Sequence, residues 1–312
     1  MKQTRSTSKF CIITCFLYFL LMSPVSADVL DSKTIFNASH KLRSMARVYM
    51  AFEDFSEATP LLKQACKLLE STECEEEYSL CLIDLAYVYL HVNEYKLSLE
   101  YCQQGFNIQL KVLGENHPNL AYTLRLLSNI YLELGNIEAS IHSIDRALQI
   151  TDIYYSEFDP FRAPFCLAKA RIMAASEKYS EAEEIYNKYL PIIMSYYGKN
   201  NLYTSQILTD LGWLSLKQLK LRDAKVLFEE ALKIKNKIYG SNHHSMIPCW
   251  EGLANILIEE NNYSDAKLYL TTALEEAKNI LQQREAKNIR DRLSYLETQE
   301  KNLHKHEFSY KL

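Results

Sequence analysis

The stretch Tyr179–Tyr186, Y-S-E-A-E-E-I-Y, returns two periods of 42 residues later as Y-S-D-A-K-L-Y-L at Tyr263–Leu270. In both copies a tyrosine and a serine precede an alanine, and a large residue follows the alanine by four positions. A spacing of four places two side chains on one face of a helix. A helical stretch that recurs at a fixed period indicates a repeat architecture.

Small residues recur at three positions of each period, and a large residue lies between the second and the third. The first position holds Ala86, Ser128, Ala170, Gly212 and Ala254; the second Ser98, Ser140, Ala182, Ala224 and Ala266; the third Gly105, Ala147, Tyr189, Ala231 and Ala273; the large residues are Cys102, Ile144, Tyr186, Phe228 and Leu270. An earlier unit with Ala46, Ala58, Leu62 and Ala65 precedes them by 40 residues. Small residues let two helices of a hairpin approach closely, and stacking buries the apolar faces. The pattern predicts six stacked helical hairpins.

Two residues depart from this pattern. Tyr189 stands where the other units have a small residue, and Gly105 weakens its helix. Both predict locally altered packing, in the second and the fourth unit.

The pattern resembles the tetratricopeptide repeat (TPR), with L-A-Y-V-Y at Leu85–Tyr89 as a further example. The 42-residue period and the G-x-x-H-P connection at Gly114–Pro118 are similar to the kinesin-light-chain type. The resemblance covers residues 39–280 and implies an all-α, right-handed α-solenoid of about six TPR helical hairpins plus a C-terminal capping helix. The expected repeats are approximately 39–72, 79–112, 121–154, 163–196, 205–238 and 247–280.

The stretch L-G-E-N-H-P-N at Leu113–Asn119 has the glycine, histidine and proline of an active-site loop. Gly114 has counterparts 42 residues apart at Ser156, Gly198 and Gly240, so the loop is interpreted as a structural turn between hairpins. We expect each glycine to end a helix in a left-handed cap, with Pro118 and Pro160 near the next helix starts. His117, His243 and His244 are expected to be capping or turn residues.

The N-terminus is typical of a secretory signal peptide at residues 1–27. Lys2, Arg5 and Lys9 precede an apolar run at 10–22, and Val25-Ser26-Ala27 offers a cleavage site after Ala27. The run is shorter than the roughly 20 residues of a membrane-spanning helix. The alternative is an uncleaved N-terminal anchor. The expected location is secreted or periplasmic, with no membrane span after removal of the signal.

The rest of the chain is mildly acidic. The formal net charge is −4, and removal of the three positive charges of the signal would take it to −7. Such a chain is a poor candidate for nucleic acid, which attracts basic proteins. Residues 28–38 are expected to be a short linker, 281–300 a capping helix with Ile289, Leu293 and Leu296 on one stripe, and 301–312 a frayed tail.

Six cysteines remain after the signal. Cys81, Cys102, Cys166 and Cys249 fall in apolar helical stretches and are interpreted as buried thiols, whereas Cys66 and Cys74 flank a connection and are candidates for a disulfide. No C-x-x-C pair, nucleophile motif, phosphate-binding loop or zinc motif occurs in the sequence. We therefore expect no enzyme activity, no cofactor and no metal site. The acidic segment 73–77 is interpreted as a solvated loop, or as a docking patch for a basic partner.

The TPR resemblance implies that the fifth and ninth positions of each first helix line a concave groove. Among these positions, the candidate peptide-binding residues are Arg43, Arg47, Tyr87, Arg125, Asn129, Arg171, Trp213 and Asn255. Arg125 and Asn129 are one turn apart, so both can reach one ligand, and an arginine suits a carboxylate. The alternative is that these arginines pair with neighbouring acids such as Asp84 or Glu133.

The sequence therefore favours a non-enzymatic scaffold or adaptor that acts outside the cytoplasm and holds a protein or peptide partner, with an acidic segment or free carboxylate, in the concave groove. One alternative is a structural envelope protein that associates with itself. Another is a regulatory subunit of an enzyme or a secretion complex.

Overall fold

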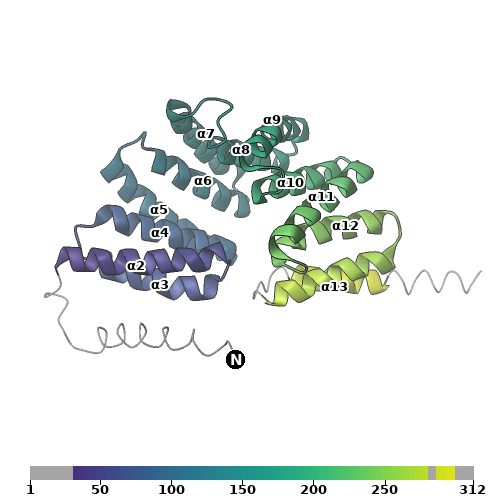
Figure 1. The fold of residues 1–312 in the computed structure, drawn as a ribbon, viewed down its shortest axis with the longest axis horizontal. Coiled ribbons are helices and arrows are strands. Elements are labelled where there is room, and N and C mark those ends of the chain that lie inside the picture. The colour runs from purple at the N-terminus through teal and green to yellow at the C-terminus, as the bar shows by residue number, and fades with distance from the viewer. Residues whose placement is uncertain (1–30, 280–285, 299–312) are drawn as a thin grey trace, which may run out of the picture.

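The computed structural model describes residues 31–279 and 286–298, and all regular structure in these ranges is helical. The helices are α2 (Ser32–Ala51), α3 (Phe55–Leu69), α4 (Glu75–His91), α5 (Tyr95–Leu113), α6 (Pro118–Glu133), α7 (Ile137–Tyr154), α8 (Ala163–Ala175), α9 (Tyr179–Tyr197), α10 (Leu202–Lys217), α11 (Leu221–Tyr239), the 3-10 helix η2 (His244–Met246), α12 (Ile247–Glu259), α13 (Tyr263–Asn279) and a last helix at 286–298. They form six hairpins stacked in chain order (Figure 1), which confirms the predicted all-α solenoid. The predicted signal peptide at 1–27 and tail at 301–312 lie outside the described residues.

The small residues of the repeat lie where the two helices of each hairpin meet. Every alanine and serine of the pattern is fully buried, and so are the large residues between them, such as Ile144 and Phe228. The serines also find partners for their hydroxyl groups: Ser98 Oγ donates to the carbonyl of Ala86 at 2.6 Å, and Ser140 Oγ to that of Ser128 at 2.7 Å. A hydroxyl is tolerated here because a carbonyl of the facing helix accepts its hydrogen bond.

The turns inside the hairpins share one backbone conformation. One residue in each has a φ between 57° and 76°: Glu53, Asn93, Gly135, Glu177, Leu219 and Asn261. This left-handed residue lets the chain reverse after the first helix.

The glycines between hairpins have a backbone conformation that differs from the one we predicted. Gly114, Gly198 and Gly240 have φ between 80° and 84° but ψ of 168°, 163° and −176°, so they are extended mirror-image residues and not left-handed caps. This region of backbone space is almost closed to residues with a Cβ atom. No atom lies within 4 Å of the position that a Cβ would take at these glycines, so backbone conformation and not packing requires glycine here.

The third junction, where Ser156 replaces glycine, takes another path. Helix α8 begins at Ala163, so Pro160 lies in the connection, three residues before the helix start. The connection lies over Tyr189, whose hydroxyl donates to the carbonyl of Glu157 at 2.8 Å and accepts from Arg162 at 3.1 Å. The large side chain at a small position is thus fully buried against a rearranged loop, which confirms the altered packing predicted for the fourth unit.

Gly105 also has a packing role. A Cβ at this position would lie 2.7 Å from Cδ1 of Ile83 and 3.1 Å from the carbonyl of Ser79. The glycine therefore gives the Ile83 side chain room in the second hairpin, and Ile83 in turn lines the concave face. This is the altered packing that the sequence predicted for the second unit.

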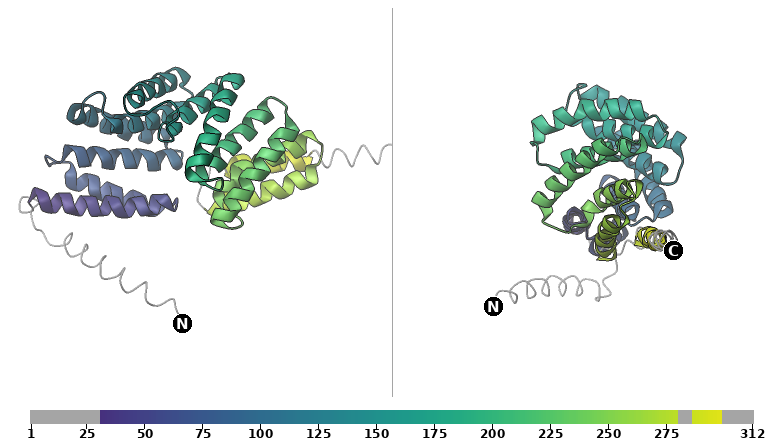
Figure 2. Two further views of the ribbon diagram at one scale, coloured as in Figure 1. Left: turned by 45° about the horizontal axis from the view of Figure 1, so that its top comes forward. Right: turned by 90° about the vertical axis from the view of Figure 1, so that its right-hand side faces the viewer.

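The stack curves until its two ends face each other (Figures 1 and 2). Nε2 of His244, at the start of the sixth hairpin, contacts the carboxylate of Glu53 in the turn of the first, 191 residues earlier in the chain. His117 and His243 cap α6 and η2 by accepting from the amides of Asn119 and Ser245, as predicted. His244 was predicted to be only a capping or turn residue, but its contact with Glu53 joins the two ends of the arch.

The cysteines of the described ranges all carry free thiols, so Cys66 and Cys74 are not bridged. Cys81, Cys102, Cys166 and Cys249 are buried, which confirms the interpretation of these residues as small apolar side chains. Burial raises the pKa of the Cys102 thiol. Within the described ranges, no helix is long and apolar enough to cross a membrane, and no three acidic, histidine or cysteine side chains are grouped as metal ligands.

Candidate functional site

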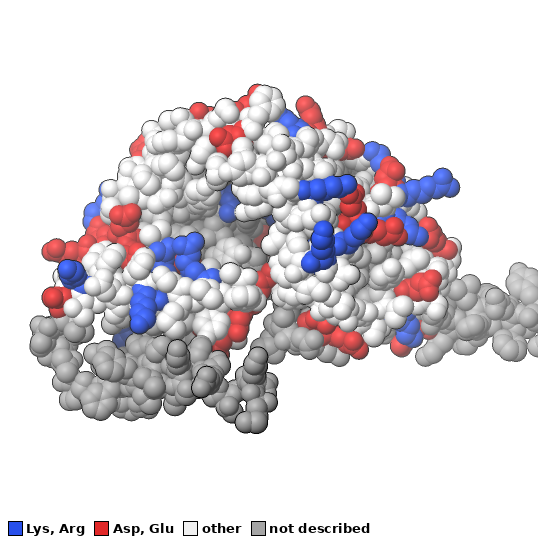
Figure 3. Space-filling model, in the orientation of Figure 1, with Lys and Arg blue, Asp and Glu red and all other residues white. Residues whose placement is uncertain are grey.

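The concave face encloses a cavity of about 1290 Å³. First helices of the hairpins supply most of its wall, chiefly α2, α4 and α6, with contributions from α8, α12 and the last helix. Basic side chains reach into this hollow between the two halves of the arch (Figure 3). Six of the eight candidate residues line it: Arg43, Arg47, Tyr87, Arg125, Asn129 and Arg171.

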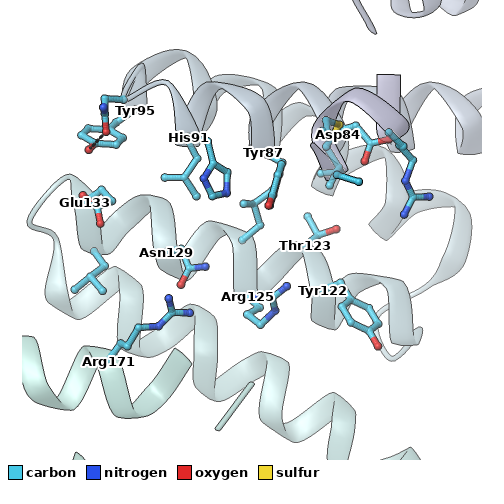
Figure 4. A pocket seen from close by; sticks show the side chains of 18 of the residues that line it. Asp84, Tyr87, His91, Tyr95, Tyr122, Thr123, Arg125, Asn129, Glu133 and Arg171 are labelled. Atoms are coloured by element: carbon cyan, nitrogen blue, oxygen red, sulfur yellow. Dashed lines mark hydrogen bonds between the residues drawn. The ribbon is translucent and has the colours of Figure 1, made fainter. Parts of the chain in front are cut away.

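Helix α6 places Arg125 and Asn129 in the centre of this wall. His117 caps the helix and Pro118 opens it, while Leu124 and Leu127 anchor it in the core. The opposite face points inward. In Figure 4 Arg125, Asn129 and Arg171 extend into one common space, opposite Tyr87 and His91 of α4. Three hairpins therefore bring their polar side chains to one site.

Arg125 has no carboxylate partner among the described residues. Its Nε atom is buried without a hydrogen bond, and its guanidinium lies 5.9 Å from the ring centre of Phe165. Burial lowers the pKa of Arg125, and the like charge of Arg171 lowers it further. The guanidinium remains charged, because an arginine pKa starts far above neutrality. A charge that has lost water and has no counter-charge is poised to bind an anion.

Arg171 is in a similar position. Its Nε atom is also buried without a hydrogen bond, and the described residues offer it no ion pair within 4 Å. The carboxylate of Asp210 lies near enough for Arg171 to counteract the rise in the pKa of Asp210 that burial causes. Asp210 itself accepts hydrogen bonds from Gln206 at 2.8 Å and Tyr186 at 3.3 Å. Both inner arginines therefore keep donor groups for a ligand.

Arg43 behaves as the alternative interpretation predicted. Its Nε donates to Asp84 at 2.7 Å, and its Nη1 lies 3.4 Å from Glu77. Burial raises the pKa of Asp84 even though Arg43 counteracts it. Within the acidic segment 73–77, Glu73 and Glu76 are exposed as expected, whereas Glu77 is buried in the first turn of α4. Arg43 joins the first two hairpins and has little freedom to bind a ligand.

An aromatic wall faces the inner arginines, and sequence reasoning missed part of it. The His91 ring lies 4.3 Å from that of Tyr87 and 5.2 Å from that of Phe55. Burial lowers the pKa of His91, and the positive charge of Arg171 adds to this effect. His91 lies one turn after Tyr87 on α4, and only this spacing could have indicated that it faces the cavity.

The end of the cavity at the sixth hairpin is filled by the chain itself. Arg292, from the last helix, donates from Nη1 to Glu251 at 2.9 Å and from Nη2 to the side-chain carbonyl of Asn255. Burial raises the pKa of Glu251, and Arg292 counteracts that rise. Asn255 therefore already has a partner, contrary to our expectation of a ligand-binding residue. No signal in the sequence pointed to Arg292.

Trp213 lies elsewhere as well. Its ring packs edge-on against Phe228 with the ring centres 5.6 Å apart, and it is not part of the cavity wall. Phe228 fills the space left by Gly212 and Gly252, where a Cβ would lie 2.7 Å and 2.3 Å from its ring. Trp213 thus covers the core between the fifth and sixth hairpins.

Comparisons with known proteins agree with this architecture. The sequence profile described as tetratricopeptide repeat matches residues 78–152 and 165–237. The fold is a tetratricopeptide-repeat solenoid. The protein KINESIN LIGHT CHAIN-RELATED 3 of Arabidopsis thaliana is 24% identical over 244 residues, which are 75% of this chain and 36% of that protein. The clustered mitochondria protein homolog of Candida albicans is 25% identical over 165 residues, 52% of this chain and 12% of that protein.

Solved TPR structures have the same fold. NprR in complex with its cognate peptide NprX has a TM-score of 0.65 at 18% identity and covers 98% of this chain and 83% of its own. Rap protein complexed with competence and sporulation factor has a TM-score of 0.61 at 16% identity, covering 88% and 77%. At these identities the likeness concerns the fold alone. This chain spans well under half the length of the two relatives above.

The TPR register explains which side chains meet. Arg125 and Asn129 hold the same two repeat positions as Glu251 and Asn255, three periods of 42 residues later. In the third repeat Arg125 and Asn129 face open space in the cavity. In the sixth repeat Glu251 and Asn255 accept hydrogen bonds from Arg292.

Proposed function

We propose that the protein is a non-enzymatic scaffold that holds a segment of a protein or peptide in the concave cavity. The carboxylate of an acidic residue, or of a free C-terminus, binds between Arg125 and Arg171, and Asn129 donates to the ligand from its side-chain amide. The observation that carries the proposal is the pair of guanidinium groups that share one cavity without a carboxylate partner in the described chain.

The contact in the sixth repeat supports this geometry. There, the acid at the first position of the pair and the carbonyl of the asparagine at the second accept from two nitrogens of one guanidinium. Arg125 and Asn129 present the same arrangement with the charge reversed. An arginine and an asparagine amide one helical turn apart suit the two oxygens of a carboxylate.

TPR solenoids of similar fold support a protein or peptide partner. The solved NprR structure contains its cognate peptide, and the Rap structure contains competence and sporulation factor. The cavity is large enough for a short stretch of extended chain, because cavities of roughly 300–1,000 Å³ already bury a small ligand.

The test is peptide binding by the double variant Arg125→Glu/Arg171→Glu. The probes are short acidic peptides with a free C-terminal carboxylate, and the measurement is isothermal titration calorimetry. We expect the double variant to lose at least about 100-fold in affinity, equivalent to roughly 2.7 kcal/mol.

The control is Arg222→Glu/Lys225→Glu, which makes the same charge change at two exposed positions of α11. It should bind like the wild-type protein. Equal binding by both variants, with unchanged circular dichroism, contradicts the proposal.

We also propose that the protein acts outside the cytoplasm, which rests on the signal-like residues 1–27. Mass spectrometry of the chain after expression in a host with a secretory pathway tests it. A mature chain that begins at Asp28 supports the proposal, and an intact chain retained in the cytoplasm contradicts it.

A further inference from the structure

Six aromatic side chains gather beside the cavity, at the junctions that flank the fourth hairpin. We call them the aromatic rim: Tyr122, Tyr155, Phe161, Tyr196, Tyr197 and Tyr203. From Tyr155 onward, successive rings have centres 6.2, 5.8, 4.7 and 5.1 Å apart. The rim therefore brings together residues from α6, the connection before α8, the end of α9 and the start of α10.

Both ends of the rim lie near Arg125. Tyr122 lines the cavity next to Arg125 on α6, and burial together with the neighbouring Tyr155 raises the pKa of Tyr122. Tyr203, at the other end, is close enough to Arg125 to counteract the lowering of the Arg125 pKa. The Tyr122 ring also packs at 5.1 Å on Phe165, over which Arg125 lies. The rim is thus continuous with the proposed carboxylate site.

The rim exposes far more aromatic surface than the fold requires. The exposed fractions of Phe161, Tyr196 and Tyr203 are 46%, 56% and 47%. An apolar patch that stays in water on a folded protein is typical of a binding surface. Tyrosine is also the residue type that contributes much of the binding energy in protein interfaces, since it is large, stiff and carries one polar atom.

We propose that the aromatic rim is a second subsite for the same peptide, and that it binds a large apolar side chain close to the peptide's carboxylate. This inference rests on the proposed function. Tyr122 and Arg125 are three residues apart on one helix, so their Cβ atoms are roughly 5–6 Å apart. An extended peptide advances about 3.3 Å per residue. The apolar residue therefore lies about two positions from the acidic one.

The occupant follows from the position of the rim. The rim adjoins a cavity that holds two arginines without a carboxylate partner among the described residues, so the occupant needs an acidic and an apolar side chain within short reach of each other. A peptide segment can place an acidic side chain in the cavity and an apolar one on the rim at the same time. The partner is thus an extended segment in which an acidic residue and an aromatic residue lie two positions apart.

The test uses three peptides with both ends capped, so that each has at most one carboxylate. They contain Phe-Gly-Glu, Ser-Gly-Glu or Phe-Gly-Gln between identical Gly-Ser flanks. Calorimetry should show that the wild-type protein binds the first about tenfold more tightly than the second, since an aromatic contact with its buried area contributes about 1.4 kcal/mol. The Tyr122→Ala/Tyr203→Ala variant removes the two rim residues next to Arg125 and should bind the two peptides equally, and Tyr122→Ala alone should lose part of the difference.

The control Leu268→Ala removes an exposed apolar side chain from α13 and should keep the tenfold preference. Equal binding of the first two peptides by wild type contradicts the second subsite but leaves the carboxylate site standing. A preference that survives in the rim variant also contradicts it. No measurable binding of either acidic peptide, or equal binding of the Gln peptide, contradicts the proposed function and with it this inference. Misfolding cannot imitate the expected result, because the rim variant must still bind the Ser-Gly-Glu peptide.

Discussion

The third and the sixth repeat hold the same two positions of the first helix in opposite states. In the third repeat, Arg125 and Asn129 face the cavity without a partner for the charge. In the sixth, Glu251 and Asn255 grip Arg292 of the following helix. The difference comes from the place of each repeat in the stack. The helix at 286–298, which follows the sixth hairpin, lies against its inner face. Inner repeats are covered only at their edges, and their concave side stays open to a partner.

Giving the third repeat the acid and asparagine of the sixth should have the largest effect on peptide affinity. Arg125→Glu turns the third pair into a copy of the sixth, with an acid and an asparagine. We expect it to lose the acidic peptide by at least about 100-fold, and to gain weak binding of an arginine-containing peptide, because the charge complementarity reverses. Calorimetry with both peptides measures this. Arg222→Glu, exposed on α11, should change neither, and retention of the acidic peptide by Arg125→Glu would contradict the role of the pair.

Arg292 and Arg125 should also differ in their contribution to the free energy of unfolding. Arg292→Met leaves the half-buried carboxylate of Glu251 without its partner and should lower the free energy of unfolding by about 1–3 kcal/mol. Arg125→Met removes an unpaired charge while keeping the stem, so we expect a change within about 0.5 kcal/mol, or a gain. Urea denaturation compares the variants.

Adding Glu251→Gln to Arg292→Met should recover much of the loss, because the unpaired carboxylate is then gone. Equal losses for the two Met variants would mean that Arg125 has a structural partner after all.

A variant of Asp210 tests whether this buried carboxylate competes with a ligand for Arg171. Burial raises the pKa of Asp210, so folding disfavours its charged form relative to the unfolded chain. The stability that this contributes is present below the unfolded pKa and is lost as the pH rises through the folded one. Asp210→Asn should therefore raise the free energy of unfolding at pH 7 by about 1 kcal/mol and show no gain at pH 3. The same variant should bind the acidic peptide more tightly. A loss of stability at pH 7 would contradict this account.

The smallest effect should come from His91. Burial lowers its pKa, Glu53 partly counteracts this, and Arg171 lowers the pKa further, so the neutral ring is favoured more than in a free histidine. As the pH falls through this lowered pKa, the histidine gains a positive charge opposite the inner arginines. Peptide affinity should then rise by about threefold as the pH falls below the usual histidine pKa of about 6.5, until the ligand's own carboxylate protonates. His91→Gln should remove the rise, and a fall in wild-type affinity over this range would contradict the prediction.

The helical period predicted the packing well, because close packing leaves a local signature. Positions such as Ala182 and Phe228 meet their neighbours at fixed spacings, and the residue type there is limited by volume. That first helices line the cavity was implied by the TPR resemblance. It was wrong on the glycine junctions, since sequence tells that glycine is needed but not which positive-φ conformation it takes.

The candidate site was only partly predictable, for a physical reason. Equivalent repeat positions point in equivalent directions, so Arg125, Asn129 and Arg171 could be named from sequence. Their partners could not, because a partner depends on which distant side chain the curvature brings near. The pairing of Arg43 with Asp84 was one alternative that the sequence left open. The hydrogen bond from Arg292 to Asn255 had no signal in the sequence.

The sequence by itself determined the hairpins, their order and the residues buried between them, because these follow from contacts within one period or between adjacent ones. Only the tertiary structure decided which charges stay unpaired, how the arch closes through Glu53 and His244, and where the aromatic rim forms. These depend on the accumulated curvature of six hairpins. Each hairpin adds a small rotation, and the sum places residues up to 191 positions apart in contact.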